Sequence, residues 1–288
     1  MRVRIVVAGL LLFSLSGSVF ALIGPPTAEL EKGQWSDGFN YSYSSDDLGK
    51  ETIKYTYQDF DSTGVEIDSG SGRYSLEVKD FEMDRYYGRV GYGLLDSLEV
   101  YGQAGATKIK AKEREVGDTE WFGYESDTDF AWGLGAKYTF LRQEKIDWGA
   151  TAQLNWFGFD DSEKYTDTFD IGEGVTETDI GKEDTNIDLM DLFVAVGPTV
   201  DMGGWKLFGG ALYKLITADY DYKDHGSYTD TDENSGTYTE KDSGDYHKDS
   251  FGGYLGAEFN VYKNSVVQVE GLGTNNSWGL SAGIEVRF

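Results

Sequence analysis

The stretch "DTDENSG" holds the densest group of residues that could do chemistry. Asp230, Asp232 and Glu233 offer carboxylate oxygens, the ligands that calcium and similar divalent cations prefer. The spacing departs from that of a helix–loop–helix calcium site. Gly236 falls one place late, and Lys241 stands where the closing Glu is needed. We therefore expect these carboxylates to form a loose divalent-cation site rather than a specific calcium site.

Both histidines lie in the same acidic segment. The triplet "DYH" (Asp245, His247) resembles the Asp-x-His half of the omptin protease site, and "HGS" (His225, Ser227) resembles the His-x-Ser of an outer-membrane lipid deacylase. An omptin site also needs paired aspartates on the facing wall, and the sequence singles out no such pair. A deacylase site would face lipid, whereas His225 stands among charged residues. We expect no enzymatic activity and no cofactor, with a membrane-embedded hydrolase as the third alternative.

The elements that carry these residues follow a period of two. "DFAWGLGAKYTFL" places Phe130, Trp132 and Leu134 on one face and Gly133 and Lys137 on the other, which is the alternation of a β-strand. Short polar turns fall near 95–96, 142–144, 203–204 and 263–264, and long acidic segments span 111–126, 160–186 and 220–247. Short turns at one end and long loops at the other are typical of a transmembrane β-barrel.

Counting strands back from the C-terminus predicts a closed, up-and-down antiparallel barrel of about ten strands. The segments "ETIKYTYQDF" and "GVEIDSGSGRYSLEV" are interpreted as a β-hairpin that extends the first external loop. If both spanned the membrane, the total would be twelve. Either total is even, as expected when both termini lie on the same side.

The contents of the two strand faces separate a membrane barrel from a soluble β protein. One face is apolar with aromatic ends, while the other is rich in Gly and carries sparse charges of both signs. A soluble sheet would instead carry dense charge on its outer face. Narrow barrels are largely filled by side chains, so we interpret the inner charges as lumen-filling ion pairs. They are Arg85, Arg89, Lys137, Glu258, Glu270 and Glu285.

The first 21 residues have the order of a secretory signal peptide. Arg2 and Arg4 precede the apolar run "IVVAGLLLF", and small residues lead to Ala21. We expect residues 22–34 to form a short periplasmic segment and 35–288 to form the barrel. The final strand, "NSWGLSAGIEVRF", ends on the aromatic residue Phe288.

Three pieces of the chain resemble small bacterial outer-membrane β-barrel proteins, of porin-like or adhesin-like type. They are the signal peptide, the strand–turn–strand unit "YGRVGYGLLDSLEVYGQAG" and the terminal "GIEVRF". The resemblance implies an outer membrane of the Gram-negative type. It also implies that Phe288 acts as an insertion signal for the barrel-assembly machinery. It implies no activity, since barrels of this size serve as adhesins, pores, structural proteins and enzymes.

The amino-acid composition excludes several classes of partner and chemistry. A net charge of -26 excludes nucleic acid, whose phosphates need clustered Lys and Arg, and 15% aromatic residues argue against disorder. The absence of cysteine removes disulfides and thiol catalysis. We expect a structural or surface-interaction protein that presents acidic external loops, with outer-membrane lipid and divalent cations as partners. A narrow pore for small solutes or ions is the alternative.

Overall fold

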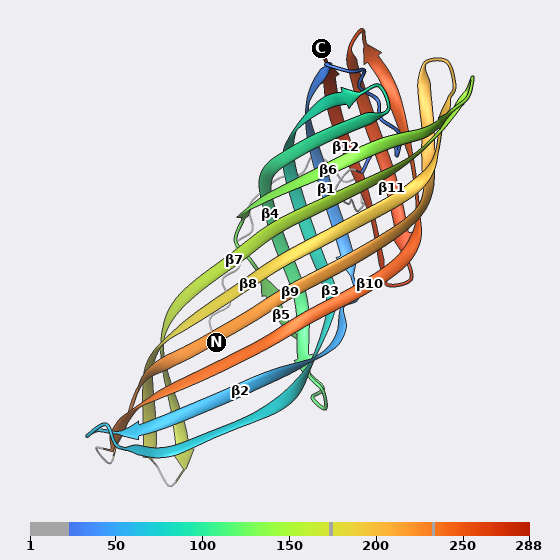
Figure 1. Cartoon of the computed structure of the whole chain (residues 1–288). Coiled ribbons are helices and arrows are strands. Elements are labelled where there is room, and N and C mark those ends of the chain that lie inside the picture. Colours follow the sequence, from blue (N-terminus) through green and yellow to red (C-terminus); the bar gives the residue numbers. More distant parts are fainter. Residues whose placement is uncertain (1–22, 173–174, 232–233) are drawn as a thin grey trace, which may run out of the picture.

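The computed structural model describes residues 23–172, 175–231 and 234–288 and is all-β (Figure 1). The signal peptide predicted over 1–21 lies outside the described residues. Within the described part, no helix is long and apolar enough to cross a membrane. The strands are β1 (Trp35–Asp46), β2 (Gly49–Asp61), β3 (Glu66–Leu95), β4 (Leu98–Glu115), β5 (Phe122–Glu125), β6 (Asp129–Arg142), β7 (Ile146–Gly172), β8 (Val175–Asp201), β9 (Trp205–Asp230), β10 (Ser235–Tyr262), β11 (Ser265–Thr274) and β12 (Ser277–Arg287).

Ten of these strands close into a ring, which confirms the predicted up-and-down antiparallel barrel. β1 pairs with β12 on one side and with the second half of β3 on the other, and β10 pairs with β11. Both termini of the ring meet at the short-turn end, where the Trp35 and Phe288 backbones exchange two hydrogen bonds of 2.9 Å. Neither β2 nor β5 belongs to the ring. β2 pairs with the parts of β3 and β10 that extend beyond the external end of the ring, and β5 pairs with the last part of β4.

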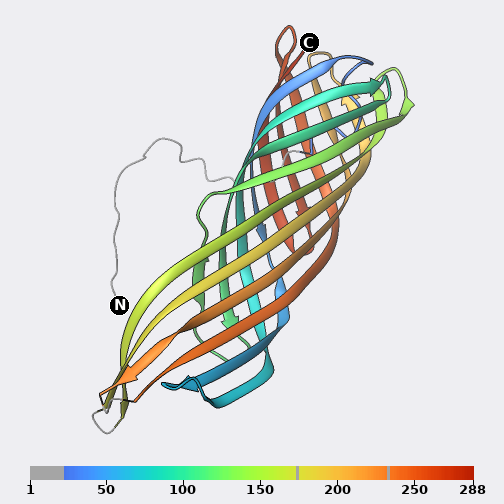
Figure 2. The same ribbon diagram turned by 60° about the vertical axis from the view of Figure 1, so that its left-hand side comes forward.

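The long acidic segments are strands rather than the loops we expected. β7 and β8 remain paired out to Asp170 and Thr176, and β9 and β10 out to Thr229 and Ser235. These segments alternate Thr and Tyr with acidic residues, and Thr and Tyr favour strands even where no core lies beneath them. The predicted hairpin of β2 and β3 joins them, since β2 pairs with β10. The result is a sheet, here called the extension, that leans out beyond the ring (Figures 1 and 2).

The outer surface of the ring is apolar in the middle and aromatic at both edges. Leu134, Val90 and Leu255 are each at least half exposed. At the external edge the Trp132 and Trp156 rings stack with centroids 4.4 Å apart. Aromatic residues also ring the short-turn end, where Trp35, Tyr138, Phe140, Tyr262 and Phe288 are exposed. An apolar band between two aromatic girdles is the surface that a bilayer requires.

The segment expected as a short periplasmic tail instead enters the barrel. Ile23 and Leu30 are 0% and 1% exposed, and the inner wall leaves room for the chain between them. A Cβ on Gly149 would lie 2.5 Å from the Pro26 carbonyl oxygen, and one on Gly93 would lie 1.9 Å from that of Glu31. The Gly-rich inner face therefore accommodates this segment, which fills the lumen at the short-turn end.

Candidate functional site

The six predicted lumen charges are all buried inside the ring. At the short-turn end, the Glu258 carboxylate accepts hydrogen bonds from Arg287 Nη2 at 2.8 Å and Gln268 Nε2 at 2.7 Å. Glu285 accepts from Arg287 Nε at 2.7 Å, and Arg89 lies 3.9 Å from Glu99. Charges of opposite sign thus neutralise one another across the lumen.

Glu270 instead holds the N-terminal segment. Its two carboxylate oxygens accept hydrogen bonds from the backbone N–H groups of Ile23 at 2.7 Å and Gly24 at 2.8 Å. Further along, the N–H of Ala28 donates to the Thr139 hydroxyl at 2.9 Å. The segment is therefore fixed by side chains from the barrel wall.

Two further ion pairs lie in the middle of the lumen. Arg85 donates to Asp191, which also accepts from Asn155 Nδ2 at 2.6 Å. Lys214 lies 2.6 Å from Asp46, and both are buried. Sequence reasoning did not include Asp46 or Asp191 among the inner charges. The alternation along β1 from Ser42 and Ser44 could have placed Asp46 inside.

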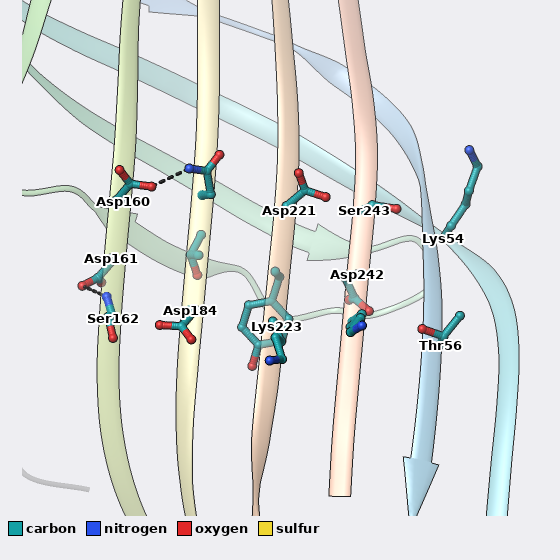
Figure 3. Close-up of a pocket in the computed structure, with 14 residues that line it drawn as sticks. Lys54, Thr56, Asp160, Asp161, Ser162, Asp184, Asp221, Lys223, Asp242 and Ser243 are labelled. Atoms are coloured by element: carbon teal, nitrogen blue, oxygen red, sulfur yellow. Dashed lines mark hydrogen bonds between the residues drawn. The ribbon is translucent and has the colours of Figure 1, made fainter.

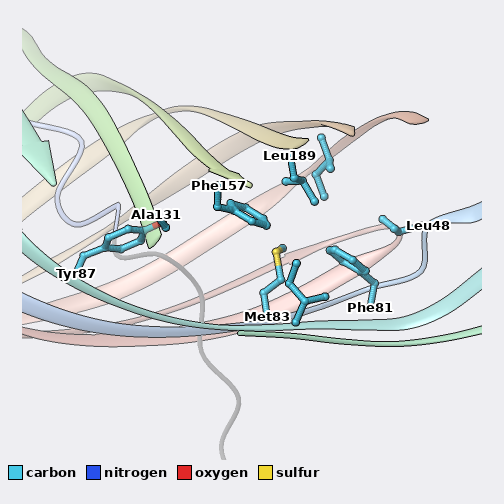
Figure 4. Packing of buried hydrophobic residues seen from close by; sticks show 9 residues of the cluster. Leu48, Phe81, Met83, Tyr87, Ala131, Phe157 and Leu189 are labelled. Carbon is cyan, nitrogen blue, oxygen red and sulfur yellow. The ribbon is translucent and has the colours of Figure 1, made fainter. Parts of the chain in front are cut away.

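Above these pairs the interior becomes apolar, which the sequence prediction missed (Figure 4). The buried side chains are Leu48, Phe81, Met83, Tyr87, Ile109, Ala131, Phe157, Leu189 and Ile216. The runs "LMDLFVAV" and "LFGGALYKLI" are apolar on both faces, a pattern typical of strands buried on both sides. From these runs Leu189 and Ile216 enter the tier, while Phe193, Phe208 and Leu212 pack with Ile23 in a second buried cluster. The sequence pattern could therefore have predicted an apolar part of the interior. This apolar tier lies at the level of the external aromatic girdle.

A chamber of about 270 Å³ lies where the apolar tier meets the extension. Its walls include apolar side chains, four tyrosines and three carboxylates: Leu76, Val78, Phe81, Ile109, Ile187, Leu189, Tyr124, Tyr220, Tyr222, Tyr246, Glu51, Glu113 and Asp245. Burial raises the pKa of Glu113. The pKa of Tyr220 is also raised, mainly by burial and in addition by the negative charge of Glu113. No Lys, Arg or His lines the chamber within the described chain.

A second hollow, a groove of about 680 Å³, runs across the outer face of the extension over β7, β8, β9, β10 and β2 (Figure 3). Lys54, Lys223 and Lys241 stand among aspartates such as Asp184 and Asp221. Side-chain amides and hydroxyls complete the lining. The groove can hydrogen-bond a polar partner, but its lining has neither a histidine nor a cysteine that could act as a base or nucleophile.

Three of the four residues considered for hydrolysis are exposed. Asp245 and His247 are exposed and flank the inward Tyr246, whose hydroxyl donates to the Leu48 carbonyl at 2.7 Å. Ser227 is also exposed, whereas His225, two residues earlier on β9, is partly buried. In each triplet the proposed partner of the histidine, Asp245 or Ser227, is therefore exposed to solvent.

The candidate cation site is only partly described. Asp230 accepts hydrogen bonds from the Asn234 backbone N–H at 2.9 Å and from its Nδ2 at 2.8 Å. Asp232 and Glu233 lie outside the described residues. Among residues 23–172, 175–231 and 234–288, no three His, Asp or Glu side chains gather closely enough to hold a metal.

Comparisons with known proteins give structural matches alone. No family model and no curated protein matches the chain. The outer membrane protease OmpT from Escherichia coli shares 11% identity at a TM-score of 0.39, covering 88% of this chain and 97% of that one. Ail, the attachment invasion locus protein of Yersinia pestis, shares 10% at a TM-score of 0.25, covering 89% and 99%. An outer membrane channel from Pseudomonas putida F1 shares 13% at a TM-score of 0.28, covering 92% and 98%.

The class of protein is defined by the geometry of the chain itself. A closed ring leaves no strand edge exposed to lipid. Its outside is an apolar band between aromatic girdles, and its lumen holds the charges. The chain is therefore an outer-membrane β-barrel.

Proposed function

We propose that this protein is a non-enzymatic surface-interaction protein of the outer membrane. In this proposal the ring anchors the protein in the membrane, and the extension is the surface that binds partners. One observation carries the proposal: the chain fills its own lumen with residues 23–30 and with paired charges, yet continues six paired strands beyond the apolar band. Such a design favours presentation of a surface over passage of solutes.

The charge of the extension indicates the kind of partner. Residues 160–186 carry 10 acidic and 2 basic residues, and residues 220–247 carry 8 and 2. A surface of this charge attracts cationic groups over distances of about one Debye length. We propose divalent cations and basic patches on other surface molecules as the partners of the extension. Outer-membrane lipid surrounds the ring.

A shortened extension tests this function. Residues 161–185 and 221–243 would each be replaced by a two-residue turn, leaving the ring and the lumen intact. Cells that display the full-length protein should adhere to a surface coated with basic protein, and cells that display the shortened protein should not. The matched control is a surface coated with neutral dextran, to which neither should adhere. Equal adhesion by both proteins would exclude the extension as the interaction surface.

The alternative, a narrow pore, is tested by planar-bilayer recording. The filled lumen favours silence, because narrow barrels whose interior is occupied by side chains leave no water path. Discrete conductance steps from the purified full-length protein would instead support the pore and contradict the role of the ring as a sealed anchor.

A further inference from the structure

The chamber at the top of the lumen differs in chemistry from the rest of the interior. Elsewhere inside the ring, Asp46, Asp191 and Glu258 are paired with Arg or Lys, and Glu270 accepts two backbone hydrogen bonds. The lining has three carboxylate residues, of which Asp245 is exposed, and it includes no Lys, Arg or His within the described chain. The charges of Lys248 and His247 act on Glu51, so Glu113 is the carboxylate of the chamber without a cation beside it. An apolar cavity whose charged groups all carry the same sign is complementary to a ligand of the opposite sign.

Glu113 is the central group. It lies on β4 opposite Val78, and its carboxylate has no hydrogen bond or ion pair within the described chain. Three phenols lie close enough for the charge of Glu113 to raise their pKa: those of Tyr74, Tyr124 and Tyr220. Glu113 is half-buried. A carboxylate that is partly withdrawn from water without a partner is destabilised, and a cation beside it offsets that cost.

The aromatic lining adds a second feature. Tyr220, Tyr222 and Tyr246 extend from neighbouring strands β9 and β10 into the chamber, and the buried hydroxyl of Tyr124 has no hydrogen-bond partner. Aromatic faces attract organic cations, most strongly where water is excluded. Phenol rings together with carboxylates therefore suit an ammonium group better than a metal ion, which needs several converging oxygens.

We propose that the chamber binds a small organic cation, an ammonium group carried on an apolar body. The ammonium group lies against Glu113 and the tyrosine rings. The apolar body packs against Phe81, Ile109 and Leu189 at the chamber floor. A dry cavity of about 150 Å³ accommodates benzene, so a chamber of about 270 Å³ admits a substituted aromatic ring. Glu51 and Glu113 are partly exposed, so the chamber is connected to solvent.

The test compares two probes of the same shape, 2-phenylethylamine and 2-phenylethanol. At about pH 7.5 the amine is charged, as a lysine side chain would be, and the alcohol is not. Binding to the full-length protein in lipid nanodiscs is followed by isothermal titration. We expect saturable binding of the amine at one site per chain, at least about ten-fold tighter than that of the alcohol.

Variants assign the binding to the chamber. Glu113→Gln keeps the size of the side chain and removes its charge, and it should weaken amine binding at least about ten-fold. The matched control is Glu115→Gln, two residues along β4, because Glu115 is exposed and lies outside the chamber lining; it should bind like the wild type. Ala218→Leu, which fills the chamber from β9, should abolish binding of both probes while the barrel still shows heat-modifiable migration on gels.

Three results would overturn the proposal: no saturable heat with the amine, equal affinity for amine and alcohol, or unchanged binding by Glu113→Gln. Equal affinity would make the chamber a site for neutral apolar molecules. The proposal does not rest on the surface-interaction function, since adhesion by the extension and amine binding in the chamber use different residues and are measured separately.

Discussion

Substitution of Glu270 by Gln should release the N-terminal segment from the lumen. In the native barrel the two Glu270 oxygens accept hydrogen bonds from the Ile23 and Gly24 N–H groups at 2.7 and 2.8 Å. A Gln side chain can accept only one of these bonds, and its amide NH2 then faces the other donor. The substitution therefore weakens the attachment of the segment to the barrel wall at Ile23 and Gly24.

The magnitude follows from the number and kind of bonds. Hydrogen bonds to a charged group contribute about 1.5–3 kcal/mol each, and a neutral replacement contributes about 1 kcal/mol. Losing two charged acceptors and regaining one neutral bond should weaken docking by about 3 kcal/mol. That corresponds to a roughly 100-fold larger undocked population.

The assay uses a cysteine as a reporter, because the natural chain has none. Ala28→Cys places a thiol on the segment at a position that is 8% exposed, and a water-soluble maleimide modifies it only when the segment undocks. When docking is fast, the modification rate follows the open population, so Glu270→Gln should raise it by about 100-fold. Glu285→Gln is the matched control, since Glu285 bonds Arg287 rather than the segment.

The outcome that would refute this reasoning is specific. If Glu270→Gln and Glu285→Gln are modified as slowly as the wild type, while all three proteins fold, Glu270 does not hold the segment. If both substitutions accelerate modification equally, the effect comes from the loss of lumen charge and not from the two hydrogen bonds.

Three further predictions concern other parts of the barrel. Asp191→Asn leaves the buried Arg85 guanidinium without its counter-charge and should lower the free energy of unfolding in urea by about 3–5 kcal/mol. Phe288→Ala should lower the yield of heat-modifiable barrel in cells without changing the urea midpoint of the folded fraction. Burial raises the pKa of Glu113 above its ordinary 4.5, so its contribution to stability is present below that value and is lost as pH rises through the folded value. As the pH rises above 4.5, the wild type should therefore lose stability relative to Glu113→Gln until Glu113 is ionised in the folded state. Parallel pH profiles of the two proteins would contradict this.

The outer surface could be predicted from the sequence because it follows one rule. Every second residue must be apolar where the strand meets lipid, so the alternation around Trp132 and Leu134 gave the strand face directly. Turn lengths then gave the direction of the strands. The ten-stranded ring and the hairpin of β2 and β3 follow from these local patterns and agree with the structure.

The interior could not be predicted in the same way because its contacts are long-range. Arg85 and Asp191 are 106 residues apart, and Ile23 and Glu270 are 247 apart, so no spacing pattern connects them. Acidic composition suggested solvated loops over 160–186, yet the backbone of each long strand is paired with its neighbours. Pairing of the backbone across four strands prevailed over the polarity of the side chains.

The arrangement of the lumen explains why its charges can be both buried and stable. The N-terminal segment lies inside the short-turn end, and the apolar tier around Met83 and Phe157 lies toward the external end. Between them Arg85 and Asp191 lie away from water, where an ion pair is strong but an unpaired charge is costly. Because the segment and the apolar tier are separate, releasing the segment by Glu270→Gln should speed thiol modification without producing conductance steps. An open path would also require the apolar tier to separate, and that tier forms the floor of the chamber.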